Sequence, residues 1–286
     1  MAPSERKGQR MPQSNRNRNR RRWVIAATAV AGAVLVPAAA SAVAAESPDS
    51  EAVPAPVVEP RIVGGEPASV GDHPYAVYLA DSAGGQFCGG TLVSRNAVVT
   101  AAHCTASMSP ADITVVAGRE DTRTGEGEMS AVRDIWVSPD YTDYGSGNDI
   151  AVLKLTDSLR YRPAAVATAA DAGAYAEGTS ATVLGWGRTS EGGARSTILR
   201  GAQVPIAGDA TCGQAFGNYD NRTMVCAGYP EGGVDACQGD SGGPLVVNGT
   251  LIGVVSFGEG CAQPGKPGVY TRVATYAEDI ARESRR

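Results

Sequence analysis

From residue 62 onward the chain is a succession of apolar runs, each only three to seven residues long, separated by Gly, Asn, Asp or Pro. Short runs rich in Val, Ile, Leu and Thr are typical of β-strands, and their close spacing predicts an antiparallel barrel or sandwich. The expected strands are residues 76–79, 91–93, 97–100, 113–117, 131–137, 150–155, 181–184, 204–206, 245–247, 251–256 and 268–272. The fold class is therefore all-β.

Helix is expected to be nearly absent until the end of the chain. Val273, Tyr276, Ala277 and Ile280 recur at the spacing of one helix face, so a terminal helix should pack that face against the body. A polar break at residues 157–163 predicts a crossover between two halves, with the division near 157–165.

The N-terminus has the order of a secretory signal. Residues 1–22 are rich in Arg and Asn, residues 24–36 are apolar, and small residues follow. We expect cleavage after Ala44, with Ala42 as the runner-up, so residues 1–44 form a signal peptide and the protein is secreted. An uncleaved anchor is the alternative, because residues 24–45 carry no charge, although the apolar run is shorter than the ~20 residues of a membrane span. Twin-arginine export is a weaker interpretation.

Residues 45–61 are acidic and rich in Pro, which predicts an extended segment without a packed core. A plain linker is one interpretation. We favour a propeptide, because the segment ends at Arg61 directly before Ile62, leaving residues 62–286 as the folded domain.

The folded part is acidic. Residues 62–286 carry 16 Lys and Arg against 25 Asp and Glu, a net charge near −9. This balance argues against nucleic acid or an anionic membrane as the main partner.

Six cysteines follow the export signal and predict three disulfides, for which the sequence alone allows 15 pairings. They are Cys88, Cys104, Cys212, Cys226, Cys237 and Cys261. Zinc is the competing interpretation, but the chain has no Cys-x-x-Cys pair and only two histidines. We expect no metal and no cofactor.

A serine nucleophile needs a base, a carboxylate that orients the base, and donors for the developing oxyanion. His103 follows an apolar run, whereas His73 lies in a polar turn and is expected at the surface. Ser241 stands among glycines, a pattern shared with α/β-hydrolases. Those enzymes place their histidine after the serine, and no histidine follows Ser241, so that alternative fails.

Asp149 is the best candidate for the orienting carboxylate. It directly precedes the apolar run that begins at Ile150, an odd place for an acid unless a buried partner needs its charge. A simple turn-forming aspartate is the alternative.

Five segments together resemble the chymotrypsin/trypsin family of serine proteases, in the family's order and over residues 62 to about 280. They are Ile62-Val-Gly-Gly, Thr100-Ala-Ala-His-Cys, Asn148-Asp-Ile-Ala, Gly185-Trp-Gly and Asp235-Ala-Cys-Gln-Gly-Asp-Ser-Gly-Gly-Pro. The resemblance implies two packed six-stranded antiparallel β-barrels with the site between them and a C-terminal helix. It also implies protein or peptide substrates, proteinaceous inhibitors as further partners, and a monomer.

The resemblance assigns roles to single residues. Ser241 would be the nucleophile, His103 the general base and Asp149 the residue that orients it. The backbone N–H groups of Gly239 and Ser241 would form the oxyanion hole. The family's disulfides would pair Cys88 with Cys104, Cys212 with Cys226, and Cys237 with Cys261.

The same resemblance places Asp235 at the base of the primary pocket, so cleavage after Arg or Lys is expected. The other pocket residues it implies are Ala236, Gln238, Ser256, Phe257, Gly258 and Gly268. Ala236 stands where many relatives carry a serine hydroxyl, which favours Arg over Lys. Phe257 stands where a tryptophan is usual.

Activation is implied as well. Cleavage after Arg61 would free the α-amine of Ile62, which in the family turns inward and pairs with a carboxylate, here Asp240. Arg61 matches the expected specificity, so the enzyme could activate itself.

Two further hypotheses complete the set. The family's calcium loop corresponds to residues 118–128, but Arg119 stands where a ligating acid is expected, so we predict a solvated loop. A catalytically silent relative that only binds is the alternative function, and it is disfavoured because the nucleophile, the base and the new N-terminus are all intact.

Overall fold

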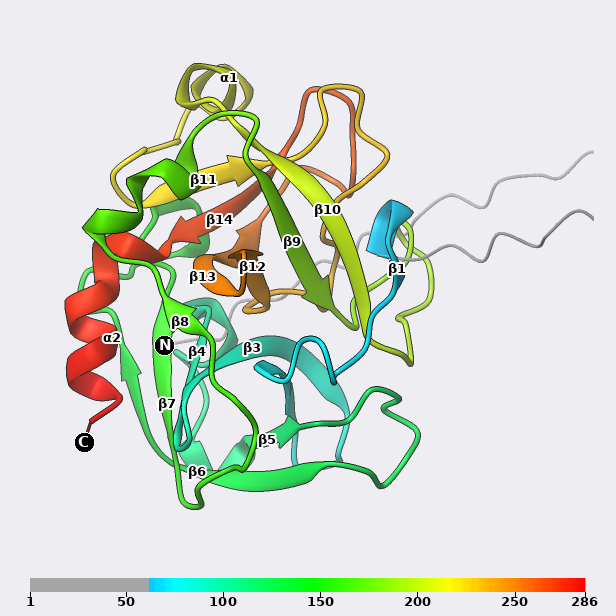
Figure 1. Ribbon diagram of the computed structural model, residues 1–286, viewed down its shortest axis with the longest axis vertical. Coiled ribbons are helices and arrows are strands. Elements are labelled where there is room, and N and C mark those ends of the chain that lie inside the picture. Colours follow the sequence, from blue (N-terminus) through cyan, green and yellow to red (C-terminus); the bar gives the residue numbers. More distant parts are fainter. Residues whose placement is uncertain (1–61, 286) are drawn as a thin grey trace, which may run out of the picture. The chain divides into compact units, whose positions relative to one another are not determined.

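The computed structural model describes residues 62–285 (Figure 1). The predicted signal peptide (1–44) and propeptide (45–61), including Arg61, lie outside the described residues. Within the part that is described, no helix is long and apolar enough to cross a membrane.

Six antiparallel strands close the first barrel, in the order β2-β3-β4-β7-β6-β5. They are β2 (Ala76–Ala80), β3 (Gln86–Ser94), β4 (Ala97–Thr100), β5 (Thr114–Ala117), β6 (Glu128–Val137) and β7 (Ala151–Leu155). Every residue of β2, β4 and β7 is buried, and closure pairs the strands all the way round, so the barrel has no free edge.

Six more antiparallel strands close the second barrel: β9 pairs with β10, the order continues β11-β14-β13-β12, and β12 returns to β9. They are β9 (Ser180–Gly185), β10 (Arg200–Ala207), β11 (Met224–Ala227), β12 (Pro244–Val247), β13 (Thr250–Phe257) and β14 (Gly268–Arg272). Two short strands lie beside them: β1 (Glu66–Pro67) on β10 and β8 (Ala165–Val166) parallel to β13. The expected all-β fold with two six-stranded barrels is confirmed.

The chain passes from the first barrel to the second between β7 and β8. Leu159 and Ala164 donate backbone hydrogen bonds to carbonyls of the first barrel, at Arg95 and Leu92. Ala167 then donates to the carbonyl of Leu251 on β13. The polar residues 157–163 therefore run along the first barrel before the second one begins.

Helices are few in the described part of the chain. A 3₁₀ turn (η6, Val273–Tyr276) leads into α2 (Ala277–Glu283), and the predicted face is buried at Val273, Tyr276 and Ile280. Figure 1 shows α2 beside β7 of the first barrel. One short helix precedes it in the second barrel: α1 spans Asp209–Ala215. Its residues are small or polar and bury only Cys212, so they carry no apolar stripe that could signal a helix.

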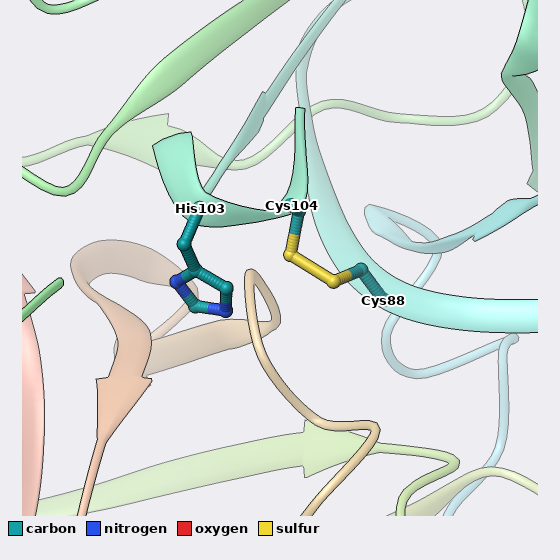
Figure 2. A group of neighbouring side chains, drawn as sticks. All are labelled: Cys88, His103 and Cys104. Atoms are coloured by element: carbon teal, nitrogen blue, oxygen red, sulfur yellow. A yellow bond between two sulfur atoms is a disulfide. The ribbon is translucent and has the colours of Figure 1, made fainter. Parts of the chain in front are cut away.

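The three disulfides pair as the family resemblance implied, and the described residues contain no free cysteine. Cys88 and Cys104 lie close to His103, a trio whose spacing would suit a metal ion (Figure 2). The two sulfurs are bonded to each other and leave no thiolate to bind one. No cysteine of the described residues is therefore available as a ligand for the zinc alternative.

Candidate active site

His103 lies in a single 3₁₀ turn (η2, Ala102–Cys104) directly after β4. Its neighbour Cys104 is joined to Cys88 on β3, so the turn is held at both ends (Figure 2). About a fifth of the His103 side chain (22%) is exposed. The sequence thus places a partly open imidazole on a rigid support at the edge of the first barrel.

Asp149 lies just before β7 and is completely buried. One carboxylate oxygen, Oδ2, is 2.7 Å from His103 Nδ1, and the other, Oδ1, accepts the His103 backbone N–H at 2.9 Å. Ser256 Oγ donates to Oδ2 at 2.6 Å. Because a carboxylate only accepts, the ring proton belongs on Nδ1, which leaves Nε2 free to take a proton.

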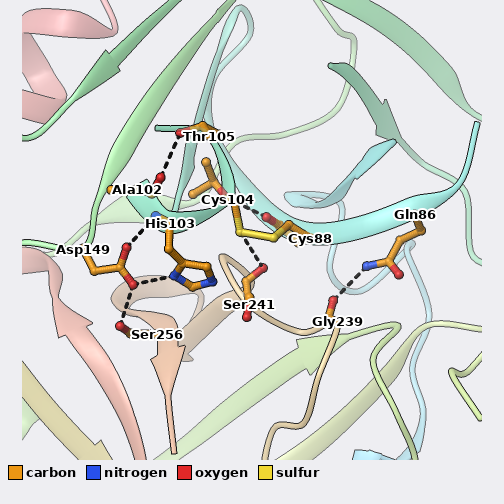
Figure 3. The surroundings of a disulfide bond; sticks show 12 residues. Gln86, Cys88, Ala102, His103, Cys104, Thr105, Asp149, Gly239, Ser241 and Ser256 are labelled. Atoms are coloured by element: carbon orange, nitrogen blue, oxygen red, sulfur yellow. Dashed lines mark hydrogen bonds and ion pairs between the residues drawn. A yellow bond between two sulfur atoms is a disulfide. The ribbon is translucent and has the colours of Figure 1, made fainter. Parts of the chain in front are cut away.

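Ser241 lies in the loop between β11 and β12. In Figure 3 the His103 ring stands between Asp149 and Ser241. No hydrogen bond joins the Ser241 hydroxyl to the ring among the contacts of residues 62–285. Catalytic hydrogen bonds of this kind commonly tighten only when substrate is bound.

The backbone around Ser241 depends on glycine. Gly242 has φ +80°, and a Cβ there would lie 2.2 Å from Thr100 Oγ1. Gly239 has φ +101°, and a Cβ there would lie 3.1 Å from Gly187 Cα. Only glycine adopts these conformations without strain, so the loop can press against β4.

Gln86 on β3 fixes the same loop from the first barrel. Its Nε2 donates to the carbonyl oxygen of Gly239 at 2.8 Å (Figure 3). The N–H groups of Gly239 and Ser241 make no hydrogen bond to another part of the described chain. Both N–H groups therefore remain free to donate to a ligand oxygen.

A cavity of about 290 Å³ opens beside His103 and Ser241. All of the predicted pocket residues line it: Asp235, Ala236, Gln238, Ser256, Phe257, Gly258 and Gly268. The structure thus brings the predicted nucleophile, base and pocket to one place.

Asp235 is the charged group of this cavity and is only 4% exposed. The Ala236 N–H donates to its Oδ1 at 2.7 Å, and no Lys or Arg of the described residues pairs with it. Burial raises the pKa of Asp235 to about 7. A buried carboxylate without a cation is a strong attractor for a cationic ligand that fills the cavity.

Tyr270 and Tyr144 are among the lining residues that were not predicted from the sequence. Tyr270 is buried with a hydroxyl that has no partner among the described residues, and it lies two positions from Gly268 on β14. Strand alternation puts these two on one face, so that signal was available. Tyr144 is 55% exposed and contacts the rings of His103 and Phe257 edge-on or tilted, at 6.2 and 5.9 Å between centroids. It comes from a loop, and nothing in the sequence pattern pointed to it.

Asp240 is a second buried carboxylate, next to Ser241 in the sequence and not among the residues that line the cavity. It accepts the Gly187 N–H at 2.7 Å and the Cys237 N–H at 2.9 Å, and no side-chain cation in residues 62–285 pairs with it. Burial raises the pKa of Asp240 to about 6. Ile62 is fully buried in the core of the second barrel, and the next carbonyl, that of Val63, accepts the Asp235 N–H at 3.1 Å.

The loop at residues 118–128 contains its own cation. Arg119 Nε donates to the carbonyl of Glu126 at 2.6 Å, and its Nη1 donates to Tyr78 Oη at 3.2 Å. The guanidinium thus ties the loop to itself and to β2.

Comparison with known proteins agrees with this geometry. The family model described as "Trypsin" matches residues 62–280. A "Trypsin" of Saccharopolyspora erythraea is 57% identical over 215 residues, which cover 75% of this chain and 94% of that protein. "Trypsin-2" of Salmo salar is 39% identical (76% and 92% covered), and a "Vitellin-degrading protease" of Bombyx mori is 40% identical (78% and 85% covered). The chain therefore belongs to the trypsin family and is a serine endopeptidase that acts on proteins or peptides.

Proposed function

We propose that this endopeptidase is secreted, cuts after Arg in preference to Lys, and uses Ser241, His103 and Asp149 as its catalytic triad. One observation carries the proposal: the cavity that opens on His103 and Ser241 is also lined by Asp235, a buried carboxylate that pairs with no cation among residues 62–285. A cationic side chain in that cavity would bring the bond that follows it next to Ser241.

The chemistry follows from the hydrogen bonds. Ser241 Oγ attacks the substrate carbonyl carbon while His103 Nε2 takes its proton. Asp149 holds the ring through Nδ1 and stabilises the imidazolium that forms. The N–H groups of Gly239 and Ser241 donate to the oxyanion, and His103 then gives the proton to the leaving amine. Water, activated by the same histidine, releases the acyl group from Ser241.

The Arg preference rests on the surroundings of Asp235. An arginine guanidinium is long and planar and can meet the carboxylate with two parallel hydrogen bonds. A lysine ammonium reaches less far and needs an additional acceptor near the end of the cavity. Ala236 offers no hydroxyl there, so lysine has one hydrogen bond fewer than it would have beside a serine.

Latency of the precursor is the second part of the proposal. Cleavage after Arg61, which lies outside the described residues, would create an α-ammonium at Ile62. Asp240 is a suitable partner because it is buried beside Ser241 and forms no ion pair within residues 62–285, although the Arg195 charge acts on it weakly. The resulting ion pair would fix the loop that carries the N–H donors of Gly239 and Ser241. Residues 1–44 would direct export, and residues 45–61 would be removed.

The test uses purified mature protein and four matched chromogenic peptides that differ only in the residue before the cleaved bond: Arg, Lys, Phe or Ala. We expect hydrolysis in the order Arg, Lys, then the others, and complete loss with a serine-directed covalent inhibitor. The Ser241→Ala variant should lose about 10⁶-fold in kcat. Faster hydrolysis of the Phe peptide would overturn the role of Asp235. A protein that cuts none of the peptides would favour the silent binding relative.

A further inference from the structure

The backbone that presents Asp149 is held by residues from the other barrel. The Thr271 hydroxyl on β14 donates to the Asp149 carbonyl oxygen at 2.7 Å. The preceding residue, Asn148, is held through its side chain: Tyr276 Oη donates to Asn148 Oδ1 at 2.8 Å. Both contacts reach from the C-terminal part of the chain to the edge of the first barrel.

Asn148 has an unusual backbone. Its φ is +56°, a conformation that few residues other than glycine adopt and that Asn tolerates better than most. Its carbonyl accepts the Ile150 N–H at 2.9 Å, so Asp149 is the middle residue of a three-residue turn. The direction of the Asp149 side chain therefore depends on how Asn148 is held.

Tyr276 is well suited to hold it. The tyrosine is 5% exposed and lies in η6, at the start of the terminal helical segment. Burial raises the pKa of Tyr276, so the hydroxyl remains a proton donor at the pH at which the enzyme works. The Asn148 Nδ2 donates in turn to the carbonyl of Asp140, at 3.3 Å. Both ends of the Asn148 amide are thus engaged, and the residue has little freedom to rotate.

We propose that Tyr276 and Asn148 are positioning residues for catalysis: their hydrogen bond sets the turn that aims the Asp149 carboxylate at both N–H groups of His103. The inference rests on the triad role proposed above for Asp149. Neither residue lines the substrate cavity, so they act on the rate of the chemical step and not on substrate binding.

The first test is Tyr276→Phe, which removes one hydroxyl and leaves the ring. Enzyme concentrations are determined by titrating the active serine, so unfolded protein does not enter the calculation of kcat. We expect kcat to fall about 10-fold, the order of loss that a small misplacement causes, while KM for an Arg peptide stays within about twofold. The proton NMR signal of His103 Nδ1–H should shift, because its acceptor has moved.

The matched control is Tyr175→Phe. Tyr175 is also a partly buried tyrosine, and its hydroxyl bonds to the Ile252 carbonyl and the Ala274 N–H of η6 without touching Asn148. This variant loosens the same segment, and we expect it to keep kcat within about twofold and the NMR signal unchanged. A wild-type kcat in Tyr276→Phe, a loss carried by KM, or an equal loss in Tyr175→Phe would overturn the inference.

A second variant keeps the unusual backbone and removes the amide. Asn148→Gly adopts positive φ without strain, and it removes both hydrogen bonds of the amide, to Tyr276 and to the Asp140 carbonyl. Its kcat should fall at least as far as that of Tyr276→Phe, and adding Tyr276→Phe to it should cause no further loss, because the partner of the hydroxyl is already absent. Losses that multiply in the double variant would contradict the proposed link.

Asp149→Asn separates this inference from the proposal on which it rests. If that change leaves activity intact, the proposed triad itself fails. If it abolishes activity while Tyr276→Phe has the wild-type rate and NMR signal, only the positioning role is lost.

Discussion

The Lys154 ammonium on β7 lies 2.8 Å from the carboxylate of Glu283, at the end of helix α2. The two side chains are only 8% and 5% exposed, so this ion pair fastens the C-terminal helix to the first barrel from inside. Asp134 also pairs with Lys154, at 2.9 Å, from its more exposed position on β6. The C-terminal helix, which follows the second barrel in the sequence, is thereby tied to the first barrel.

Removing one partner of this pair should destabilise the protein strongly. Lys154→Met removes the buried counter-charge of Glu283 and leaves it paired with the more exposed Arg282, at 3.1 Å, and we expect a loss of about 3 kcal/mol in the free energy of unfolding. Urea unfolding in a Ser241→Ala background, which prevents self-digestion, measures it. The double variant Lys154→Met, Glu283→Met should recover most of the loss. A single variant as stable as its parent would show that the pair contributes little.

The proposed preference for Arg over Lys should weaken when one hydroxyl is added next to Asp235. Ala236→Ser supplies an additional hydrogen-bond acceptor close to Asp235, which a lysine ammonium can use and an arginine can do without. We expect the ratio of kcat/KM for matched Arg and Lys peptides to fall by about 10-fold, the effect of one hydrogen bond to a charged group. Equal values for the two peptides in the unmodified enzyme would already refute the preference.

The uncleaved chain should depend on pH through Asp240. Its pKa is raised from 3.8 to about 6, so the fold favours the protonated form. The stability that Asp240 contributes is fully present below about pH 4 and is lost as the pH rises through about 6. In a Ser241→Ala precursor, Asp240→Asn cannot ionise, so the Tm of this variant relative to its parent should rise between pH 4 and pH 7. If the Tm difference between the variant and its parent stays constant over that range, Asp240 does not ionise independently there and the prediction fails.

Activation can be examined through Arg61 and Ser241. The Arg61→Gln precursor should remain latent, because the bond that is cut during activation no longer fits the pocket. If the residues before Ile62 are redesigned as a site for a protease of different specificity, treatment with that protease should restore activity. If the enzyme activates itself, Ser241→Ala precursor stays uncut in its host, and N-terminal sequencing shows this. Normal processing of that variant would assign the cut to another protease.

Chelation should leave the protein unchanged. In the loop at residues 118–128, the Arg119 guanidinium already holds the Glu126 carbonyl and Tyr78 Oη, and its charge disfavours a nearby divalent cation. We expect the same Tm with calcium and with a chelator, and a lower Tm for Arg119→Ala. A rise in Tm on adding calcium to the unmodified protein would contradict this.

Strands with a clear apolar run were predicted almost to the residue, as at β4 and β14. The strands β1 and β8 are only two residues long and have no alternation to detect, so they become visible only through their partners β10 and β13. The four-residue β11 was missed because only one of its residues, Val225, is β-branched, whereas the equally short β4 contains three.

The functional residues also divide into those that the sequence predicted and those that only the structure revealed. Asp149 stood out because its charge adjoins an apolar run, whereas Asp235 was assigned through the family resemblance; the structure buries both. Gln86, Tyr144 and Tyr276 reach the site from a strand, a loop and a terminal turn that are far from Ser241 in the sequence. Their contribution depends on how the two barrels meet, and local pattern contains no information about that.

His103 and Asp149 belong to the first barrel, whereas Ser241 and Asp235 belong to the second. A slight hinge rotation between two intact barrels would therefore separate the proposed base from the proposed nucleophile, and a displacement of only about 1 Å can cost about 100-fold in rate. On warming, the enzyme should lose its activity before either barrel unfolds, and it should regain its rate on cooling. Catalytic activity therefore depends on the interface between the two barrels, and we expect it to be lost at a lower temperature than the fold of either barrel.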